Sequence, residues 1–344
     1  MDDDPAQLLA HTEPVRAAVR TRYGGPAAVR FADVPEPAPG KGELLVRVHA
    51  TTVNRTDCAY RSGQPWINRV FCGWPRPRVQ VLGSEYAGVV AAVGDEVVSF
   101  AVGDRVFGFV EGRPGAHAEL VAVAVDGLVA SVPQGWELAD AAPGMEGAHY
   151  AHAFQRVTGL VSGRRALVHG ATGGIGTAAV QLLHAEGVEV TVVCDRLPPG
   201  RPDLLHALGA VSVVELDRGH GLDSVGRGFD AVLDATGHIS FAATRRLLRP
   251  GGSYVSSDLG RGWQNVLLAA ISPVARALGR RHVRFPLPHA DSALAGHLRQ
   301  LMLHGAYRPV VDRTYQFDEL REAYAYVETG RKVGNVVVVT SEDG

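Results

Sequence analysis

The sequence is short of cysteine, of unbalanced charge and of long apolar runs, and each shortage excludes a class of protein. Its three cysteines, Cys58, Cys72 and Cys194, are too few and too far apart for a disulfide framework or a four-cysteine zinc lobe, and they fit a reducing compartment. Lys and Arg total 34 against 36 Asp and Glu, so no global field draws the chain to nucleic acid or to an anionic membrane. An uncharged apolar run of about 18 residues, the mark of a membrane span, does not occur. We therefore expect a cytoplasmic protein that acts on a small molecule.

The composition is that of a globular protein large enough for two domains. Hydrophobic residues make up 46% and charged residues 20% of the 344 residues, close to the averages for soluble proteins. A domain holds roughly 100 to 200 residues. Residues 1–14 begin with three aspartates and lack the basic-then-apolar layout of a signal peptide, so we interpret them as a flexible leader.

The region up to about Val132 has the pattern of a β-rich domain. Its apolar residues come in short, often alternating runs that Gly, Pro and Asp interrupt, which is typical of a barrel. These runs are Ala17–Val19, Leu44–Val48, Tyr86–Val93, Arg105–Val110 and Glu119–Val123.

From Glu137 onward, Ala-rich helical periodicity alternates with compact β-branched runs, which indicates βαβ units around a parallel sheet. A helix is predicted over Asp291–Leu303 and a short amphipathic helix over Phe317–Val327. The last apolar run, Val336–Thr340, fits either a barrel strand that returns to the first domain or an extra edge strand of the parallel sheet. The strands predicted for that sheet are Arg165–His169, Val188–Cys194, Val211–Glu215, Asp230–Leu233 and Ser253–Ser256.

A glycine cluster stands between the first of these strands and the next predicted helix. Glycines there remove the Cβ atoms that would keep a phosphate away from backbone N–H groups, and the helix that begins near Gly174 adds the positive end of its dipole. This strand–loop–helix context predicts a dinucleotide site. Its residues are Gly170, Ala171, Thr172, Gly173, Gly174, Ile175 and Gly176.

Two charged residues after the second strand bear on the choice of cofactor. Asp195 can accept hydrogen bonds from the adenosine ribose, which favours NAD, whereas Arg196 beside it can pair with the 2′-phosphate of NADP. The alternative is that Arg196 is a solvated loop residue.

Several short motifs, in this order and spacing, resemble the zinc-independent quinone oxidoreductases of the medium-chain dehydrogenase/reductase superfamily. The resemblance covers essentially everything after Pro14. Besides the glycine loop, its motifs are Val53-Asn54-x-x-Asp57, Leu82-Gly83-Ser84-Glu85, Gly103-Asp104-Arg105-Val106-Phe107-Gly108, Asp234-x-Thr236-Gly237, Pro250-Gly251-Gly252 and Gly334-x-Val336-Val337.

The resemblance implies an α/β protein in which a GroES-like β-barrel catalytic domain is interrupted by a Rossmann doubly wound parallel-sheet domain. The catalytic domain would comprise residues 15–135 plus 310–344, and the Rossmann domain residues 136–309. It also adds Ala235, Thr236 and Gly237 to the cofactor site. Since the family leans to NADPH, we expect NADPH, with NADH as the alternative, and a homodimer.

The resemblance further implies that the catalytic metal is missing. Zinc-dependent relatives have a Cys where this chain has Asn54 and a His where it has Ser84, and an amide and a hydroxyl are poor zinc ligands. Two positions depart from the family pattern: His149 stands where threonine is frequent, and Asp195 where a small polar residue is frequent.

Three residues are candidates for contact with the reacting groups. Asn54 offers donors and an acceptor, Tyr60 presents a polar tip on a rigid apolar body, and His149 lies on a helix expected near the nicotinamide. Ordinary surface or core packing is the alternative for Tyr60 and His149. The spacing Glu146-x-x-His149-x-x-His152 also permits metal binding, but two-histidine metal helices usually use a spacing of four, so we predict no metal site.

The function predicted from these features is metal-free transfer of hydride from NAD(P)H to a quinone or an activated C=C bond, such as that of an enone or enal. An enoyl-thioester reductase is a narrower alternative, for which Arg280, Arg281 and Arg284 would supply a basic cleft rim. A redox-silent scaffold that only binds NAD(P)H is an alternative of a different class.

Overall fold

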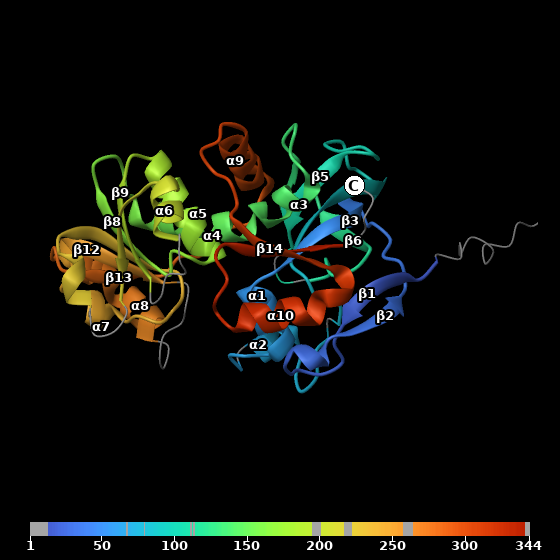
Figure 1. Ribbon diagram of the computed structural model, residues 1–344, viewed down its shortest axis with the longest axis horizontal. Coiled ribbons are helices and arrows are strands. Elements are labelled where there is room, and N and C mark those ends of the chain that lie inside the picture. Colours follow the sequence, from blue (N-terminus) through green and yellow to red (C-terminus); the bar gives the residue numbers. More distant parts are fainter. Residues whose placement is uncertain are drawn as a thin grey trace, which may run out of the picture.

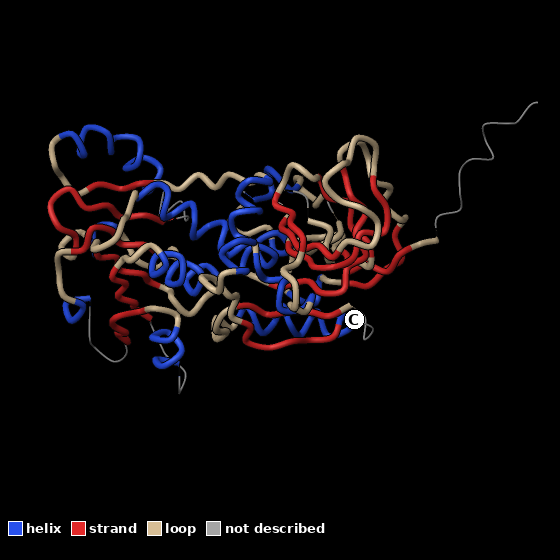
Figure 2. Tube along the Cα trace, turned by 90° about the horizontal axis from the view of Figure 1, so that it is seen from above, coloured by secondary structure: helices blue, strands red, loops and turns tan. Residues whose placement is uncertain are grey.

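Two large β-sheets lie on opposite sides of the picture in Figure 1. The protein is described by a computed structural model over residues 13–340, apart from 67, 79, 111, 113, 195–200, 217–221 and 257–263. One sheet has six parallel strands, and the other has seven, of which six follow one another and β6 is paired beside β3. In the view from above, the two parts of the molecule again lie side by side (Figure 2).

The seven-stranded sheet is arranged around its longest strand, β3 (Glu43–Val53). This strand pairs antiparallel with β4 (Glu85–Val93), with β6 (Leu120–Ala124) and with β15 (Asn335–Val339). A separate antiparallel pair is formed by β1 (Val15–Val19) and β2 (Arg30–Val34). The other strands of the seven are β5 (Arg105–Phe109), β7 (Leu128–Ser131) and β14 (Val311–Gln316).

The six-stranded sheet has the order β10-β9-β8-β11-β12-β13, the doubly wound order of dinucleotide-binding domains. Successive side chains point to opposite faces of a strand. Ala166 and Val168 therefore join the core on one face, while Leu167 joins Phe229 and Tyr254 on the other. Both faces are thus covered, as a parallel sheet requires. The strands are β8 (Arg165–His169), β9 (Glu189–Cys194), β10 (Ala210–Glu215), β11 (Phe229–Asp234), β12 (Leu248–Ser256) and β13 (His282–Arg284).

The helices lie around and between the two sheets. Helix α4 runs from the junction of the sheets into the six-stranded part (Figure 1). Helix α9 packs on β7 of the seven-stranded sheet. The longer helices are α1 (Arg55–Ser62), α4 (Glu146–Thr158), α5 (Gly174–Ala185), α8 (Gln264–Ala277), α9 (Ser292–Leu303) and α10 (Leu320–Glu328). The shorter ones are α2 (Asn68–Cys72), α3 (Leu138–Ala141), α6 (Arg201–Ala207) and α7 (Phe241–Thr244), with 3₁₀ turns at Pro26–Ala28, Ala142–Gly144, Leu222–Val225 and Phe317–Glu319.

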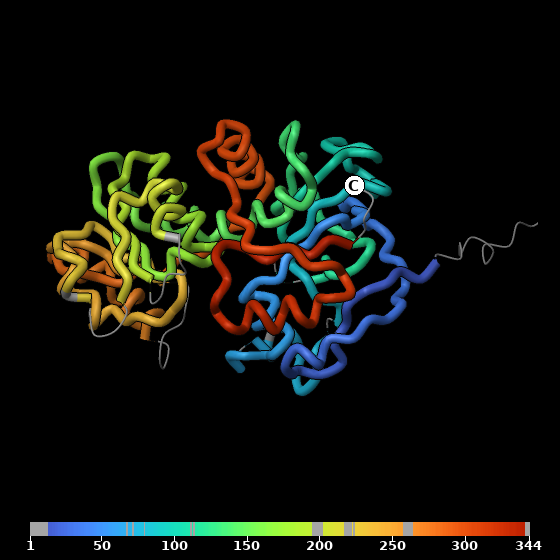
Figure 3. Tube along the Cα trace, in the orientation of Figure 1, coloured from blue at the N-terminus to red at the C-terminus, as the bar shows by residue number. Residues whose placement is uncertain are grey.

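The last strand of the chain belongs to the first sheet. β15 pairs antiparallel with β3, with Val336 opposite Val53 and Val339 opposite Ala50. Figure 3 shows the same feature as the red end of the chain beside its blue beginning. Of the two interpretations of this run, the return to the first sheet is therefore correct.

The predicted fold class is confirmed, and the predicted strands of the parallel sheet agree with β8 to β12 within a few residues. β13 was not predicted, because its three residues lie among arginines and carry no apolar pattern. No helix in the described ranges has the length and apolar character needed to cross a bilayer.

Candidate cofactor and substrate site

The glycine loop lies at the edge of the parallel sheet where three neighbouring strands end. β8 ends at His169, β9 at Cys194 and β11 at Asp234, and these strands are adjacent and parallel. The loops that follow them therefore meet at one edge, which is where doubly wound sheets bind ligands. The predicted contacts Asp195 and Arg196 follow β9 and lie outside the described residues.

Close backbone packing explains two of the glycines. A Cβ atom at Gly170, whose φ is +77°, would collide with the side chain of Thr236, and one at Gly176 would collide with the Gly170 carbonyl oxygen. Gly173, the N-cap of α5, is different, because its Cβ would meet only the Gly170 oxygen at 3.6 Å. The Gly173 position is thus free on the side where a phosphate would approach the helix N-terminus.

The turn after β11 is organised by one buried carboxylate. Asp234 accepts hydrogen bonds from Thr236 N at 3.1 Å and Gly237 N at 3.0 Å, and its Oδ1 lies 3.1 Å from His169 Nδ1. Burial alone would raise the pKa of Asp234, but these hydrogen bonds and His169 lower it overall. An ionised Asp234 therefore holds the predicted contacts Ala235, Thr236 and Gly237 against the glycine loop.

The glycine loop also forms the joint between the two parts of the molecule. Gly147 of α4 packs on the backbone of Gly174 so closely that a Cβ at Gly147 would lie 2.8 Å from the Gly174 oxygen. From the other side, Gly334 N donates to Thr172 O at 2.7 Å. Residues next to these two glycines thus lie beside the loop.

Asn54 lies next to this joint as the N-cap of α1. Its Oδ1 accepts from Asp57 N at 3.0 Å, and Asp57 Oδ2 accepts from Asn54 N in return, which completes a capping box. Its Nδ2 donates to Glu146, the first residue of α4. The hydrogen-bonding groups of the Asn54 amide are therefore already used within the protein.

Three buried carboxyl groups surround Asn54. Glu85 accepts from Glu146 N at 2.6 Å, from Met145 N at 3.1 Å and from Thr52 Oγ1 at 2.9 Å. Asp57 accepts from Ser84 Oγ at 2.9 Å. Glu85 thereby satisfies two N–H groups at the start of α4, and Ser84 is fixed by Asp57.

Burial favours the protonated form of these carboxyl groups. It raises the pKa of Asp57 and of Glu85 to about 7 each, against the opposing effect of their hydrogen bonds. The pKa of Glu146 is raised well above its usual value by burial and by the negative charges of Glu85 and Asp57. Each carboxyl group of the cluster of Asp57, Glu85 and Glu146 therefore binds a proton more readily than an exposed carboxyl group does.

Two further side chains face this cluster. Lys332, on the segment that leads into β15, is buried and donates to Gly334 O at 2.5 Å, and Glu146 partly offsets the lowering of its pKa by burial. Burial, with Cys72 nearby, raises the pKa of Tyr60 to about 12, and the Gly112 backbone bonds to it. Tyr60 is therefore a protonated hydrogen-bond donor at neutral pH.

His149 lies elsewhere. It is fully buried against Phe109 and Tyr150 and lines a cavity between α4 and α9, away from the glycine loop. The structure thus brings Asn54 and Tyr60 to one cluster and separates His149 from it. Cys58 is also buried, and burial raises its pKa to about 12, which disfavours a reactive thiolate.

The three arginines expected at the cleft rim do not lie together. Arg280 and Arg281 line a cavity of about 440 Å³ with Arg245. They precede β13, so they lie at the sheet edge opposite the glycine loop. The prediction that these two arginines form a basic cleft rim is therefore wrong. Arg284 ends β13 and lies at the same edge as the loop.

Sequence reasoning missed Glu146, Lys332 and Gly147 as parts of this site. Glu146 was considered only with His149 and His152, whereas the structure places its carboxyl group beside Asn54. Two features of the sequence pointed to these residues. Glu146 is a charged residue at the start of an otherwise Ala-rich, apolar helix, and Lys332 is a lone lysine before a strongly apolar strand.

Two family models match different parts of the chain. Residues 40–134 match the alcohol dehydrogenase GroES-like domain, and residues 208–338 match the zinc-binding dehydrogenase model. Together with the two-sheet fold and the glycine loop at the joint, they give the domain arrangement of the dehydrogenases that these models describe. The chain belongs to the medium-chain dehydrogenase/reductase superfamily, as its motifs predicted.

Individual relatives differ in what they do and in length. The spectinabilin polyketide synthase protein NorB of Streptomyces orinoci is 31% identical over 316 residues, which are 86% of this chain and 13% of that protein. The chain thus spans about an eighth of that relative. The chloroplastic quinone-oxidoreductase QR1 of Triphysaria versicolor is 26% identical over 94% of this chain and 98% of its own length.

A tomato and a mycobacterial protein complete the comparison. The 2-methylene-furan-3-one reductase of Solanum lycopersicum is 28% identical over 92% of this chain and 77% of its own length. A mycobacterial protein solved in complex with NADPH is 27% identical, with a TM-score of 0.76, over 95% of this chain and all of that one.

Proposed function

We propose that the chain is an NAD(P)H-dependent reductase whose acceptor is a quinone or the activated C=C bond of an enone or enal. The observation that carries the proposal is the contact of Gly147 with Gly174, which joins the glycine loop to the buried cluster around Asn54 and Glu146. A cofactor held by the loop and a substrate beside the cluster would then meet in one place. A quinone oxidoreductase and a 2-methylene-furan-3-one reductase among the relatives support this acceptor class.

The glycine loop fits a dinucleotide, because its open Gly173 position and the N-terminus of α5 form a cradle that a Cβ atom would fill. Its contacts would come from residues 170–176 and from Ala235, Thr236 and Gly237. When bound, the nicotinamide supplies the hydride. We propose NADPH as the preferred cofactor, with Arg196 pairing with the 2′-phosphate and Asp195 opposing it. An NADPH-bound neighbour supports this choice.

The protein's own groups would handle the proton and the developing negative charge. The phenol of Tyr60 keeps its proton and can donate to a substrate oxygen. Glu146 holds a proton at its carboxyl group beside Asn54, whose amide fixes that carboxyl. Asn54 therefore acts by positioning Glu146.

We further propose that the reaction uses no zinc. Asn54 and Ser84 offer an amide and a hydroxyl, which are weak zinc ligands, and both groups are bonded to Glu146 and Asp57. Within the described ranges, no three His, Cys, Asp or Glu side chains are grouped to hold a metal ion. The donor chemistry thus does not fit a catalytic zinc.

An enoyl-thioester reductase is the second candidate, favoured by the similarity to polyketide synthase proteins. Of the arginines considered for a thioester's phosphate, Arg284 alone ends at the edge of the glycine loop. A cofactor-binding scaffold without turnover is the alternative from another class.

We also propose a cytoplasmic homodimer formed through α8 and β13. β13 is an edge strand in the described sheet, and α8 exposes an apolar stripe at a spacing of four, three and four residues. The stripe consists of Leu267, Ile271 and Val274 on α8 and of Leu278, which directly follows the helix. Light scattering on Ile271→Glu should report a monomer where the unmodified protein is a dimer; dimers of both would overturn this interface.

A turnover screen tests the function. NADPH and NADH are each offered with quinones, enals and enoyl thioesters, and cofactor oxidation is followed at the absorbance of the reduced nicotinamide. Turnover with quinones or enals supports the proposal, whereas turnover with enoyl thioesters alone supports the second candidate. Tight cofactor binding with no turnover on any acceptor would identify a scaffold.

A further inference from the structure

A cavity that nothing in the proposed reaction uses, the arginine cavity, lies at the edge of the parallel sheet opposite the glycine loop. Its volume is about 440 Å³, within the range of small-molecule sites. Three segments form it: α7 with the residue after it, the start of β12, and the turn between α8 and β13. Its lining residues are Phe241, Arg245, Pro250, Gly279, Arg280 and Arg281.

Every charged side chain that lines the arginine cavity carries a guanidinium group. Arg281 is half-buried, and its Nε donates to Leu248 O at 2.7 Å, which holds the guanidinium in place and leaves its other four N–H donors. Arg245 and Arg280 are exposed, and their guanidinium groups make no hydrogen bond or ion pair with other described residues. The cavity thus offers donors from three cations, and no carboxylate among its lining residues competes for them.

The remaining side chains of the lining are apolar. The Phe241 ring packs against Tyr254 with its centroid 6.1 Å away, and the Tyr254 hydroxyl donates to Ile239 O at 2.7 Å. Pro250 adds a rigid ring from the start of β12. A flat ring on a ligand would therefore find an apolar wall beside the three guanidinium groups.

The positive charge extends beyond the lining of the cavity and is not balanced locally. Residues 235–290 include eight arginines and one acidic residue, Asp258, which lies outside the described residues, although acidic and basic residues are nearly equal in number over the whole chain. Burial lowers the pKa of His282, next to the cavity, and Arg284 and Arg276 lower it further. Because like charges repel, this arrangement weakens the folded state unless an anion offsets it.

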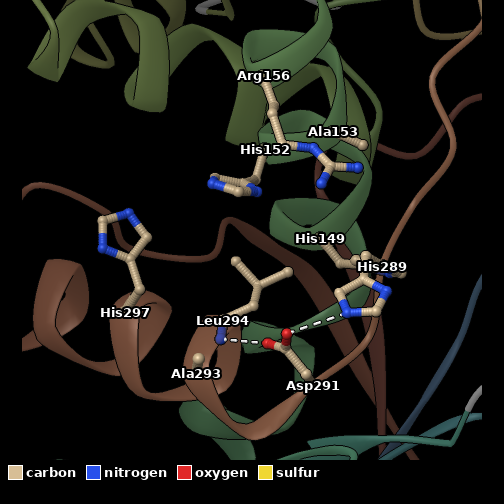
Figure 4. A pocket seen from close by; sticks show the side chains of 9 residues that line it. All are labelled: His149, His152, Ala153, Arg156, His289, Asp291, Ala293, Leu294 and His297. Atoms are coloured by element: carbon tan, nitrogen blue, oxygen red, sulfur yellow. Dashed lines mark hydrogen bonds and ion pairs between the residues drawn. The ribbon is translucent and has the colours of Figure 1, made fainter.

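The cavity between α4 and α9 differs in its charge balance. Figure 4 shows Asp291 there between His289 and the start of α9, where it accepts from Leu294 N at 2.7 Å and lies 3.2 Å from His289 Nε2. A carboxylate of the protein thus already supplies negative charge in that cavity. The arginine cavity has no such group in its lining, so it is the one suited to an anionic ligand.

We propose that the arginine cavity binds a nucleoside diphosphate. The diphosphate pairs with Arg245, Arg280 and Arg281, because guanidinium groups match phosphate oxygens in a bidentate manner. The volume leaves room beyond a diphosphate, and the nucleoside lies there on Phe241 and Pro250. The arginines line a hollow rather than a flat surface, which favours a small ligand over nucleic acid. Since the glycine loop is at the other edge of the sheet, this ligand and the cofactor would bind at the same time.

Calorimetric titration of the full chain with four probes tests this proposal. Uridine diphosphate is the main probe, because its base differs from the adenine of the cofactor. We expect it to bind saturably, pyrophosphate to bind about tenfold more weakly, and orthophosphate and uridine to bind more weakly still. One equivalent of NADPH per chain should leave these affinities unchanged.

Variants of the lining assign the two parts of the ligand. Arg245→Gln and Arg280→Gln should each weaken uridine diphosphate and pyrophosphate about tenfold. Phe241→Leu should weaken uridine diphosphate and leave pyrophosphate unchanged. Ile271→Glu, which changes the apolar stripe of α8, should bind uridine diphosphate as the unmodified protein does, because one chain holds all the lining residues.

Arg276→Gln is the matched control. It removes the same charge from an exposed position in the last turn of α8, outside the lining, and should change the affinities less than about twofold. A loss equal to that of Arg280→Gln would indicate a diffuse basic surface, such as one for nucleic acid, and overturn the proposal. Displacement by NADPH, equal affinity for uridine diphosphate and pyrophosphate, or no saturable binding at millimolar concentration would also overturn it, and none of these results bears on the reductase activity itself.

Discussion

The amide of Asn54 donates a hydrogen bond to the carboxyl group of Glu146 and so joins the N-terminal ends of α1 and α4. Both side chains are buried. Because Gly147 follows Glu146 and packs on Gly174, this one contact fixes the polar cluster relative to the glycine loop. The geometry of the proposed site therefore depends on two residues that are 92 positions apart in the sequence.

Replacing Glu146 with Gln should flatten the dependence of stability on pH. A carboxyl group whose pKa is raised in the folded protein binds its proton more tightly there than in the unfolded chain. Its stabilising contribution is present below the unfolded pKa, near 4, and is lost as pH rises through the folded values, about 7 for Asp57 and Glu85. The unmodified protein should thus lose stability between pH 5 and 8.

Glu146→Gln removes one such group and one charge that raises the pKa of its neighbours. Between pH 5 and 8, the unfolding free energy of Glu146→Gln should fall less than that of the unmodified protein. We expect the difference to be at least about 1 kcal/mol, since one pKa unit is worth about 1.4 kcal/mol. Urea unfolding at both pH values measures this, with the exposed Glu186→Gln as control. Parallel curves for Glu146→Gln and the unmodified protein would contradict the interpretation.

Valine at Gly176 or Gly173 should weaken cofactor binding by two different routes. At position 176 the side chain collides with the backbone of Gly170, so both NADPH affinity and the melting temperature should fall. At position 173 the protein has room, so NADPH affinity should fall at least about tenfold with little change in melting temperature.

Fluorescence titration with NADPH and thermal unfolding measure the two effects together. Gly296→Ala on α9, where an added Cβ meets nothing within 4 Å, is the matched control. Undiminished NADPH affinity in Gly176→Val would be incompatible with a phosphate cradle at this loop.

Arg196→Ala should weaken NADPH by roughly tenfold, equivalent to about 1.4 kcal/mol, and barely affect NADH. The reason is that only NADPH carries the 2′-phosphate that a guanidinium would pair with. Dissociation constants for both cofactors decide the matter. Equal losses would show that Arg196 does not recognise the phosphate, and a strong preference of the unmodified enzyme for NADH would mean that Asp195 governs the choice.

Purified protein should contain no stoichiometric zinc and keep its activity after treatment with a chelator. Asn54 and Ser84 are poor zinc donors and are bonded to Glu146 and Asp57. Elemental analysis before and after chelation measures the metal content. About one zinc per chain, lost together with activity, would refute the metal-free mechanism.

The features predicted well from the sequence are those encoded locally. β8, the glycine loop and the start of α5 follow one another within a short segment, and each pattern has its own physical reason. The return of the last strand needed the family resemblance to choose between two interpretations, because an apolar run fits either sheet.

The polar cluster could not be predicted in the same way. Asn54, Glu85, Glu146 and Lys332 come from four separate elements, and no periodicity relates them. The position of His149 has a similar cause, since the face of α4 that it occupies is decided by the packing of α9.

The pairing of β15 with β3 has a consequence for how the protein is made. The seven-stranded sheet receives β14 and β15 only after the whole six-stranded sheet has been synthesised. Contacts between such distant segments form slowly, because a long loop must close first. During translation, the edge of β3 that β15 later covers stays exposed while the inserted unit folds, so this edge is where a nascent chain is most open to mispairing and to capture by a chaperone.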